Sequence, residues 1–190
     1  MQRYSFSETI KNIYALIMTK VFWNSARLIR RPVYIRGKAS IIGGKKLTLG
    51  YACRLDLPGD KKTLWIGENC QFGDNTHIVA SEKVKIGDNV LIASKCFISD
   101  TSHGRYSGME QDMPETPPNI RQLYAKSVTI GNNVWIGENV VILAGSAIGD
   151  GSIIGANSII TKVIPPNSIV IGANKIIKQF EPSQKKWVKI

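Results

Sequence analysis

A single apolar residue recurs at every sixth position in the second half of the chain. It occupies Ile130, Ile136, Ile142, Ile148, Ile154 and Ile160. A period of six fits neither an α-helix, whose side chains repeat every 3.6 residues, nor an isolated strand, whose side chains alternate with a period of two. It fits a solenoid whose short strands turn corners and point one apolar residue inward at each turn.

The same spacing extends towards the N-terminus. It appears at Ile66, Phe72 and Ile78, and again at Ile86, Ile92 and Ile98. Three hexads make one triangular coil of about 18 residues. Successive coils of this kind stack by parallel strand pairing, about 4.8 Å apart. The sequence therefore predicts an all-β solenoid.

The hexads also resemble those of a known family. The motif Ile-Gly-x-Asn-Val-x stands at residues 86–91, 130–135 and 136–141, and two longer stretches cover residues 91–104 and 134–149. These stretches resemble the hexapeptide-repeat acyltransferases. In appearance they come closest to the bacterial O-acetyltransferases that modify lipopolysaccharide O-antigen, colanic acid or capsule. The resemblance implies a left-handed parallel β-helix, a homotrimer, and acetyl-CoA as co-substrate in a groove between neighbouring subunits.

Residues 1–32 form the first of three predicted segments. Ser5-x-x-Glu8 is a capping-box pattern, and the apolar residues that follow it recur at helical spacing. We therefore expect an N-terminal amphipathic helix over residues 7–30 that ends near Pro32.

The predicted β-helix covers residues 33–172 and is interrupted where the repeat vanishes, over residues 104–126. A long insertion in a regular scaffold is usually functional or disordered. Because this stretch directly follows His103, we expect a loop that leaves one corner and covers an active site. Residues 173–190 are predicted to form a short C-terminal helix and a basic tail.

His103 stands where the repeat stops, in Asp100-Thr101-Ser102-His103-Gly104. Acyl transfer from a thioester to a sugar hydroxyl needs a base that titrates near neutrality, and imidazole meets that need. The resemblance places the catalytic histidine of the family at His103. Asp100 is a second catalytic candidate. Its carboxylate either orients the imidazole ring or closes the corner as an Asx turn.

Three further side chains are candidates for the acceptor side of the site. The resemblance implies that Trp135, in Val-Trp-Ile-Gly, lines the site, although a tryptophan that packs a corner is the alternative. Asn75 and His77 precede His103 by about one coil and are expected to reach the acceptor. The related galactoside acetyltransferases use an asparagine near here, but the aligned residue is Gly73. A corner asparagine is therefore the alternative for Asn75.

The resemblance also implies a set of contacts to acetyl-CoA. They are Glu138, Ala144, Ala156, Thr161 and Lys162. Small side chains let the pantetheine arm approach the backbone, and Lys162 can meet a phosphate as a point charge. Simple corner packing is the alternative role of the two alanines. The chain contains no G-x-x-x-x-G-K-[ST] motif, so a nucleoside triphosphate site is not indicated.

Histidine and cysteine usage excludes two further classes of chemistry. The chain has two histidines, fewer than the three ligands of a zinc carbonic anhydrase on such a solenoid, so no metal is expected. Three cysteines without a C-x-x-C pair predict no disulfide framework and favour a reducing, cytoplasmic setting. Cys53, Cys70 and Cys96 each stand four residues after an apolar repeat position, which predicts core residues. Since no other nucleophile stands out, direct transfer in a ternary complex is favoured over an acyl-enzyme.

The net charge of +11 resides in the two ends of the chain. Residues 1–38 hold eight basic residues and one acid, and residues 175–190 hold five basic residues and one acid, whereas residues 39–174 hold 12 of each sign. The neutral middle argues against a nucleic-acid partner. The basic ends predict a patch that makes peripheral contact with an anionic membrane or a lipid-linked glycan at the cytoplasmic face.

These features predict an acetyl-CoA-dependent O-acetyltransferase that modifies a hydroxyl of a bacterial surface-polysaccharide sugar, with His103 as general base. Two alternatives stay open. One is an N-acetyltransferase for an amino-sugar nucleotide. The other is a catalytically silent β-helix scaffold, for which His103 and the loop would be incidental.

Overall fold

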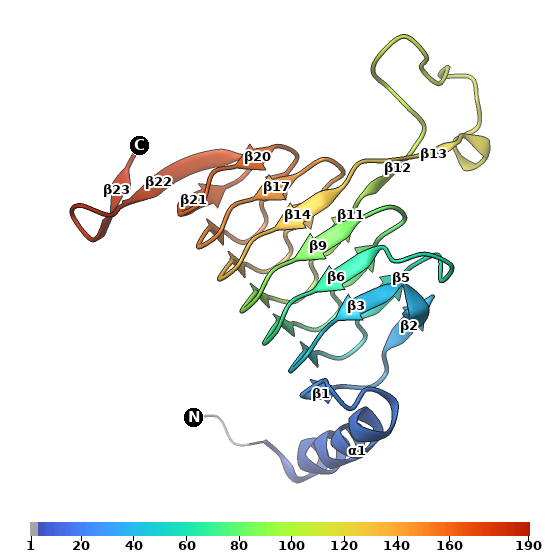
Figure 1. The fold of residues 1–190 in the computed structure, drawn as a ribbon, viewed down its shortest axis with the longest axis vertical. Helices are drawn as coiled ribbons and strands as arrows, with labels where there is room; N and C mark the ends of the chain where they lie inside the picture. Colours follow the sequence, from blue (N-terminus) through green and yellow to red (C-terminus); the bar gives the residue numbers. More distant parts are fainter. Residues whose placement is uncertain (1–3) are drawn as a thin grey trace.

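The computed structural model describes residues 4–190, and the chain winds into a parallel β-helix preceded by one α-helix (Figure 1). Helix α1 (Phe6–Phe22) lies at one end of the stacked coils. A long loop leaves the stack at one corner, and a hairpin lies at the other end.

Each full coil contributes one short strand to each of three sheets. The first sheet holds β1 (Leu28–Ile29), β4 (Thr48–Leu49), β7 (Gln71–Phe72), β10 (Leu91–Ile92), β15 (Trp135–Ile136), β18 (Ile153–Ile154) and β21 (Ser168–Ile171). The second holds β2 (Tyr34–Arg36), β5 (Arg54–Asp56), β8 (His77–Val79), β11 (Phe97–Ser99), β16 (Val141–Ile142) and β19 (Ile159–Ile160). The third holds β3 (Ile41–Gly43), which follows the short 3-10 turn η1 (Lys38–Ser40), and β6 (Leu64–Ile66), β9 (Val84–Ile86), β14 (Val128–Ile130), β17 (Ala147–Ile148) and β20 (Val163–Ile164). Neighbouring strands are parallel and in register, so equivalent hexad positions stack directly.

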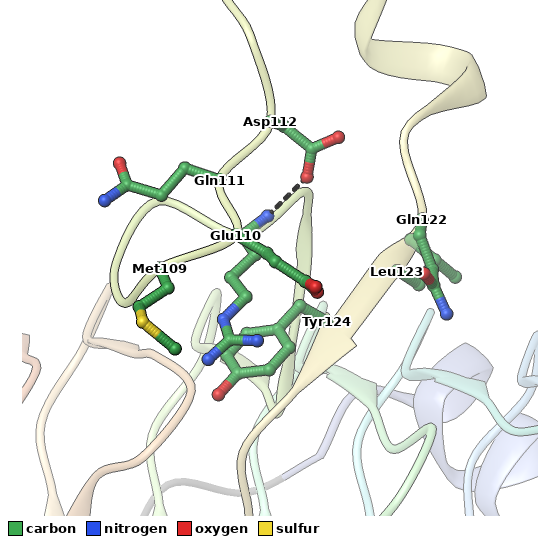
Figure 2. A pocket seen from close by; sticks show the side chains of 8 residues that line it. Met109, Glu110, Gln111, Asp112, Gln122, Leu123 and Tyr124 are labelled. Carbon is green, nitrogen blue, oxygen red and sulfur yellow. Dashed lines mark hydrogen bonds between the residues drawn. The ribbon is translucent and has the colours of Figure 1, made fainter.

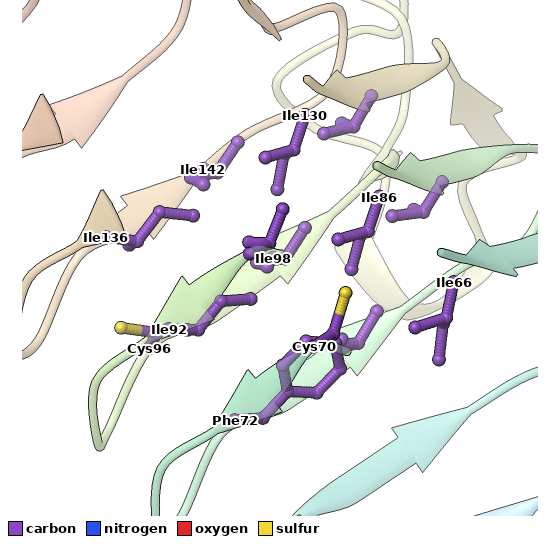
Figure 3. Packing of buried hydrophobic residues seen from close by; sticks show 14 of the residues in the cluster. Ile66, Cys70, Phe72, Ile86, Ile92, Cys96, Ile98, Ile130, Ile136 and Ile142 are labelled. Carbon is purple, nitrogen blue, oxygen red and sulfur yellow. The ribbon is translucent and has the colours of Figure 1, made fainter. Parts of the chain in front are cut away.

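The repeat residues fill the centre of the coils, where their side chains stack one above another (Figure 3). The six isoleucines of the period between residues 130 and 160 are all buried, which confirms the inward orientation that the period predicted. The three cysteines are free thiols within the same core, as predicted. Burial raises the pKa of Cys53 to about 11, so this thiol is protonated at neutral pH and is no nucleophile.

The polar half of the hexad explains the corners. In the motif Ile-Gly-Asp/Asn-Asn, the side-chain oxygen of the third residue accepts a hydrogen bond from a backbone N–H of the preceding coil. Asp88 Oδ1 accepts from the Glu68 N–H at 2.7 Å, and Asn132 Oδ1 accepts from the Asp88 N–H at 2.8 Å. The fourth residue takes a left-handed conformation that asparagine tolerates, with φ of 56° at both Asn89 and Asn133. Asn89 Nδ2 also donates to Asn133 Oδ1 at 3.2 Å. One motif therefore makes both the turn and its contact with the next coil.

The capping box at the start of α1 forms as predicted. The Glu8 N–H donates to Ser5 Oγ at 3.3 Å, and the Ser5 N–H donates to Glu8 Oε2 at 2.8 Å. Two small residues, Ala15 and Thr19, are the buried side chains of the helix. Thr19 Oγ1 accepts from the Ile29 N–H at 2.8 Å, so α1 is fastened directly to β1.

The N-terminal helix is shorter than the predicted span of residues 7–30. It ends at Phe22, and residues 28 and 29 already form β1, which pairs in parallel with β4. The β-helix therefore begins before residue 33. The reason is that β4 offers a row of backbone groups, and pairing with it satisfies more of them than another helical turn would.

The predicted C-terminal helix within residues 173–190 is wrong. β22 (Lys175–Glu181) and β23 (Lys186–Lys189) form an antiparallel hairpin that continues the first sheet beyond β21. Without the hairpin, β21 would be an open edge with unpaired backbone groups. The rings of Phe180 and Trp187 also meet edge to face across the hairpin, 5.5 Å between centroids.

The two basic segments lie at opposite ends of the stack (Figure 1). α1 and the strands that follow it form the first coil, whereas the hairpin with the basic residues of the tail follows the last coil. The expectation that both ends build one basic patch is therefore wrong for a single chain, because the whole β-helix separates them.

Two kinds of feature are missing from the described part of the chain, residues 4–190. Its single α-helix is too short and too polar to cross a membrane. It also holds no group of three or more His, Cys, Asp or Glu side chains placed to bind a metal ion.

We expect Ile164→Ala to lower the free energy of unfolding by about 2–5 kcal/mol, because truncating a buried side chain leaves a cavity in a close-packed core. The adjacent Val163 is exposed and gives a matched control, since Val163→Ala should change it by only about 0.5 kcal/mol. Urea unfolding followed by circular dichroism measures both variants. Equal losses of unfolding free energy in the two variants would contradict the inward position of Ile164.

Candidate active site

His103 lies at the foot of the loop. After β11 the chain forms β12 (Thr101–His103), which pairs antiparallel with β13 (Leu123–Ala125) and places His103 opposite Leu123. The loop is thus clamped where it leaves and re-enters the corner between the second and third sheets, and its outer part contains the 3-10 turn η2 (Pro118–Ile120). The His103 side chain is exposed at this foot.

Asp100 is fully buried directly before β12, and its carboxylate holds the corner of the preceding coil. Oδ1 accepts from the Ser81 N–H at 2.9 Å, and Oδ2 accepts from the Glu82 and Lys83 N–H groups, both at 2.8 Å. The Thr101 hydroxyl donates to Oδ1 as well, at 2.6 Å. These donors occupy both oxygens. The structure therefore corrects the expectation that Asp100 orients the His103 ring and favours its alternative, a residue that closes the corner.

Two loop residues that no motif indicated hold the turn after His103. The Tyr106 hydroxyl donates to the His103 carbonyl oxygen, and Arg121 Nη1 donates to Tyr106 Oη at 2.6 Å. The Arg121 guanidinium also lies over the Tyr106 ring, 5.7 Å from its centroid. Gly104 has φ of 101°, and a Cβ there would come within 2.8 Å of the Tyr106 hydroxyl oxygen. The sequence His-Gly-Arg-Tyr at residues 103–106 could have indicated this turn, because a glycine that tolerates positive φ and a ring with a hydroxyl group follow the histidine.

A cavity of 340 Å³ opens between the foot of the loop and the same corner of the next two coils. We call it the corner cavity. Its lining residues are Thr101, Ser102, Gly104, Tyr106, Ser107, Tyr124, Lys126, Leu143, Ala144 and Thr161. Ala144 and Thr161, two of the predicted donor contacts, therefore lie beside Ser102 and Gly104, the chain neighbours of His103.

A larger cavity of 570 Å³ lies on the loop itself (Figure 2). We call it the loop cavity. It is lined by Arg105, Met109, Glu110, Gln111, Asp112, Gln122, Leu123 and Tyr124. All but Met109 and Leu123 carry hydrogen-bonding side chains. Asp112 Oδ2 accepts from the Arg105 N–H at 2.7 Å and tightens the loop around this cavity (Figure 2). His103 itself lines neither cavity, but its ladder partner Leu123 lines the loop cavity and its chain neighbours Ser102 and Gly104 line the corner cavity.

Trp135 lies on a different face of the coil from His103. It belongs to β15 in the first sheet and is 51% exposed, in register with Leu91 on one side and Ile153 on the other. In a three-sided coil the first sheet lies across from the corner between the second and third sheets. A single chain therefore does not bring Trp135 and His103 together.

The five predicted donor contacts are divided in the same way. Glu138 and Ala156 lie where the chain passes from the first sheet to the second. Ala144, Thr161 and Lys162 lie where it passes from the second sheet to the third, on the side of His103. The corner that carries His103 therefore holds three of the five predicted contacts to acetyl-CoA in a single chain.

Asn75 and His77 have partners within the β-helix. His77 Nε2 lies 2.9 Å from Asp56 Oδ2, and its ring centroid lies 5.3 Å from that of Phe97. Burial would raise the pKa of Asp56, but hydrogen bonds from Arg54 and His77 outweigh it and hold that pKa below its ordinary value. Asn75 has φ of 58°, as a corner asparagine does. Neither side chain lines the corner cavity or the loop cavity.

A β-helix of hexads, with a histidine exposed at one corner beside small side chains, defines a hexapeptide-repeat transferase. The family described as bacterial transferase hexapeptide (six repeats) matches residues 127–162. A second description, the hexapeptide repeat of succinyl-transferase, matches residues 64–99.

Individual relatives agree with this class. The chain is 40% identical over 190 residues to the putative lipopolysaccharide biosynthesis O-acetyl transferase WbbJ of Escherichia coli K12, covering 99% of this chain and 96% of the relative. It is 41% identical over 160 residues to the galactoside O-acetyltransferase of the same organism, covering 82% and 75%. A crystal structure of a hexapeptide-repeat acetyltransferase from Vibrio cholerae O1 biovar eltor, complexed with acetyl coenzyme A, is similar with a TM-score of 0.60 and 26% identity, over 75% of this chain and 72% of that one. The chain therefore belongs to the hexapeptide-repeat acyltransferases, an enzyme family, as its motifs predicted.

We expect Asp100→Ala to lower the free energy of unfolding by about 3 kcal/mol, because three partly buried N–H groups lose their acceptor. Asp112→Ala removes a carboxylate that accepts one N–H in the loop and should cost about 1 kcal/mol. Urea unfolding of both variants measures the difference. Loss of turnover in Asp100→Ala with unchanged unfolding would restore the role of Asp100 in orienting His103.

Proposed function

We propose that this enzyme transfers the acetyl group of acetyl-CoA to a hydroxyl of a bacterial surface-polysaccharide sugar. The observation that carries the proposal is that the immediate neighbours of the exposed His103 line both cavities. Its chain neighbours Ser102 and Gly104 line the corner cavity, and its ladder partner Leu123 lines the loop cavity. A base in that position can serve a donor on one side and an acceptor on the other.

In this mechanism the His103 imidazole takes the proton of the acceptor hydroxyl while the hydroxyl oxygen attacks the thioester carbonyl carbon. Backbone N–H groups near the thioester stabilise the oxyanion of the tetrahedral intermediate. The C–S bond then breaks, and the CoA thiolate leaves and takes the proton from the imidazolium. The acetyl group passes directly from sulfur to oxygen in a ternary complex, since the three cysteines are buried thiols and no acyl-enzyme is needed.

For the donor, we place acetyl-CoA along the corners that follow β16 and β19. Ala144 and Thr161 line the corner cavity there, and the exposed Lys162, next to Thr161 in the chain, is a cation available for a phosphate. For the acceptor, the loop cavity offers six polar side chains that can bond to sugar hydroxyls. Trp135, Glu138 and Ala156 complete the site from a neighbouring copy.

We propose that the neighbouring copy belongs to a homotrimer, and the division of the site supports an assembly of this kind. Two outward rows of apolar side chains support it, one on the first sheet and one on the second. They are Leu91, Trp135 and Ile153, and Phe97, Val141 and Ile159. If the first sheet of one copy packs on the second sheet of the next, both rows are covered and a ring closes. That packing brings Trp135 of one copy to the side of the coil that carries His103 in the next.

We place the reaction in the cytoplasm, near the inner face of the membrane. One observation supports this location. The three cysteines are free thiols, which suits a reducing compartment.

We expect His103→Ala to lower turnover about 10²- to 10⁴-fold, because the acceptor hydroxyl loses its base. The release of CoA thiol, followed with a thiol reagent in the presence of candidate glycans, measures turnover. Hydroxyl and amine acceptors are assayed side by side, which separates O- from N-acetylation. Circular dichroism and light scattering verify that the variant keeps its fold and assembly. Retained turnover in a folded variant would overturn the mechanism.

A shared site predicts complementation between two inactive variants. When His103→Ala and Trp135→Ala subunits are unfolded, mixed in equal amounts and refolded, random assembly gives about a quarter of the subunit interfaces both native side chains. We therefore expect about a quarter of wild-type turnover from the mixture and far less from either variant alone. No gain on mixing would show that each chain carries a complete site, or that Trp135 has no part in it.

A further inference from the structure

The apolar stripe of α1 faces away from the β-helix. Its members are 52% to 82% exposed, and they are Phe6, Ile10, Ile13, Tyr14, Ile17 and Val21. With 3.6 residues per turn these side chains share the face opposite Ala15 and Thr19, the two buried residues of the helix. We call them the outer face of α1.

This orientation is the reverse of that in an ordinary surface helix, which turns its apolar stripe towards the core. The small side chains of Ala15 and Thr19 let α1 lie close to β1, and Thr19 Oγ1 holds the Ile29 N–H at 2.8 Å. The helix is therefore fixed with its outer face open. Contiguous apolar surface of this kind marks an interaction site.

The surroundings of the outer face are cationic. Residues 4–38 contain seven Lys and Arg residues and a single acid, Glu8. Within the described residues 4–190, only Arg36 among these seven forms an ion pair. The remaining six positive charges have no carboxylate partner in that described part of the chain, so an anionic partner would be attracted to this end.

Two of these cations lie over aromatic rings at the C-terminal end of α1. The Arg31 guanidinium lies over the Phe22 ring, 5.7 Å from its centroid, and Lys38 Nζ lies over the Trp23 ring at 5.5 Å. Side chains of this kind keep an apolar stem on apolar surface while the charged end reaches a polar layer. Apolar, aromatic and cationic groups therefore occur together at this end of the molecule, a combination typical of a helix that lies in a membrane interface.

We propose that the outer face of α1 docks on the surface of an anionic lipid bilayer. Its isoleucines and Phe6 would enter the boundary between headgroups and acyl chains, and the surrounding Lys and Arg residues would meet lipid phosphates. A second copy of this chain is the weaker candidate for the occupant. Packing two outer faces together would bring the uncompensated cations of both copies into one interface.

The arrangement in Figure 1 sets the height of the site above the bilayer. α1 runs across the end of the stack, so a bilayer on its outer face lies across that end. β10 is the fourth strand of the first sheet, and the loop that carries His103 leaves from the same coil. With coils about 4.8 Å apart, His103 stands about 15 Å above the first coil, and α1, a helix about 10 Å across, lies between that coil and the bilayer. A sugar tethered to a membrane lipid by a short glycan can reach that height; this last step rests on the proposed function, whereas the docking does not.

The experiment is sedimentation of the full chain with lipid vesicles. We expect binding to phosphatidylcholine vesicles that contain about one-third phosphatidylglycerol, and weak binding to phosphatidylcholine alone. Raising the salt concentration should release much of the bound protein, because the lipid charge is screened. Equal or absent binding to the two kinds of vesicle would overturn the proposal.

Matched variants test which surface binds. Ile13→Ser with Ile17→Ser should weaken binding at least about tenfold, because both side chains are more than half exposed and the substitutions remove apolar area that would enter the bilayer interface. Val163→Ser with Ile190→Ser changes two exposed apolar residues at the other end of the β-helix and should leave binding within about twofold. Lys185→Glu with Lys186→Glu changes the charge of the hairpin at that same end and should also leave binding within about twofold. Equal losses of vesicle binding in the α1 variant and in these two control variants would contradict docking through α1.

Light scattering of the α1 variant separates the two occupants. An unchanged molar mass together with lost vesicle binding supports docking on lipid. A changed molar mass with unchanged vesicle binding would show that a second copy covers α1, and would overturn the proposal. Acetyl transfer to a water-soluble glycan should be the same in the α1 variant and in the wild type. Failure of the proposed function would show in that assay and failure of docking in the vesicle assay, so the two are distinguishable.

Discussion

Each coil of this protein depends on backbone hydrogen bonds to the coils above and below it. Its strands are very short and pair with strands of neighbouring coils: the Gly87 N–H donates to the Ile130 carbonyl, and the Gly131 N–H to the Ile148 carbonyl, each at 2.8 Å. A lone coil could neither satisfy these groups nor bury its isoleucines. Both ends of the stack therefore need covers. Trp23 packs against the core at the first end, and the hairpin of β22 and β23 extends the sheet at the last.

The same stacking explains why the chemistry lies at a corner. A residue inside the coil is surrounded by equivalent residues of its neighbours and has little freedom to change. A loop inserted at a corner leaves the strand pairing intact, and β9 still pairs with β14 in register across the inserted loop. The Asp100 carboxylate fixes the start of that loop, because it accepts hydrogen bonds from three backbone N–H groups of the preceding coil. His103 thus stands three residues from a rigid point, although the loop that surrounds it is exposed.

Triangular geometry also explains why one chain holds an incomplete set of site residues. Successive corners of a coil point in different directions, so Trp135 and His103 cannot share one surface of one chain. Some candidate side chains serve the scaffold as well. Glu138 Oε2 accepts from the Ser94 N–H at 3.1 Å, and Thr161 Oγ1 accepts from Asn174 Nδ2 at 2.9 Å. Such contacts hold the corners steady, which suits residues proposed to form the walls of a groove.

The sequence by itself determined the coil and the place where it is interrupted. The period of six, the inward isoleucines and the corner asparagines are local patterns, and each repeat has the same surroundings as the next, so they could be read without a structure. The tertiary structure alone decided the partners of Asp100, the separation of Trp135 from His103, the C-terminal hairpin and the outward face of α1. These features depend on contacts between residues far apart in the chain. Helical spacing says that α1 forms but not which side it buries, and the open edge of β21, rather than local propensity, made residues 175–189 a hairpin.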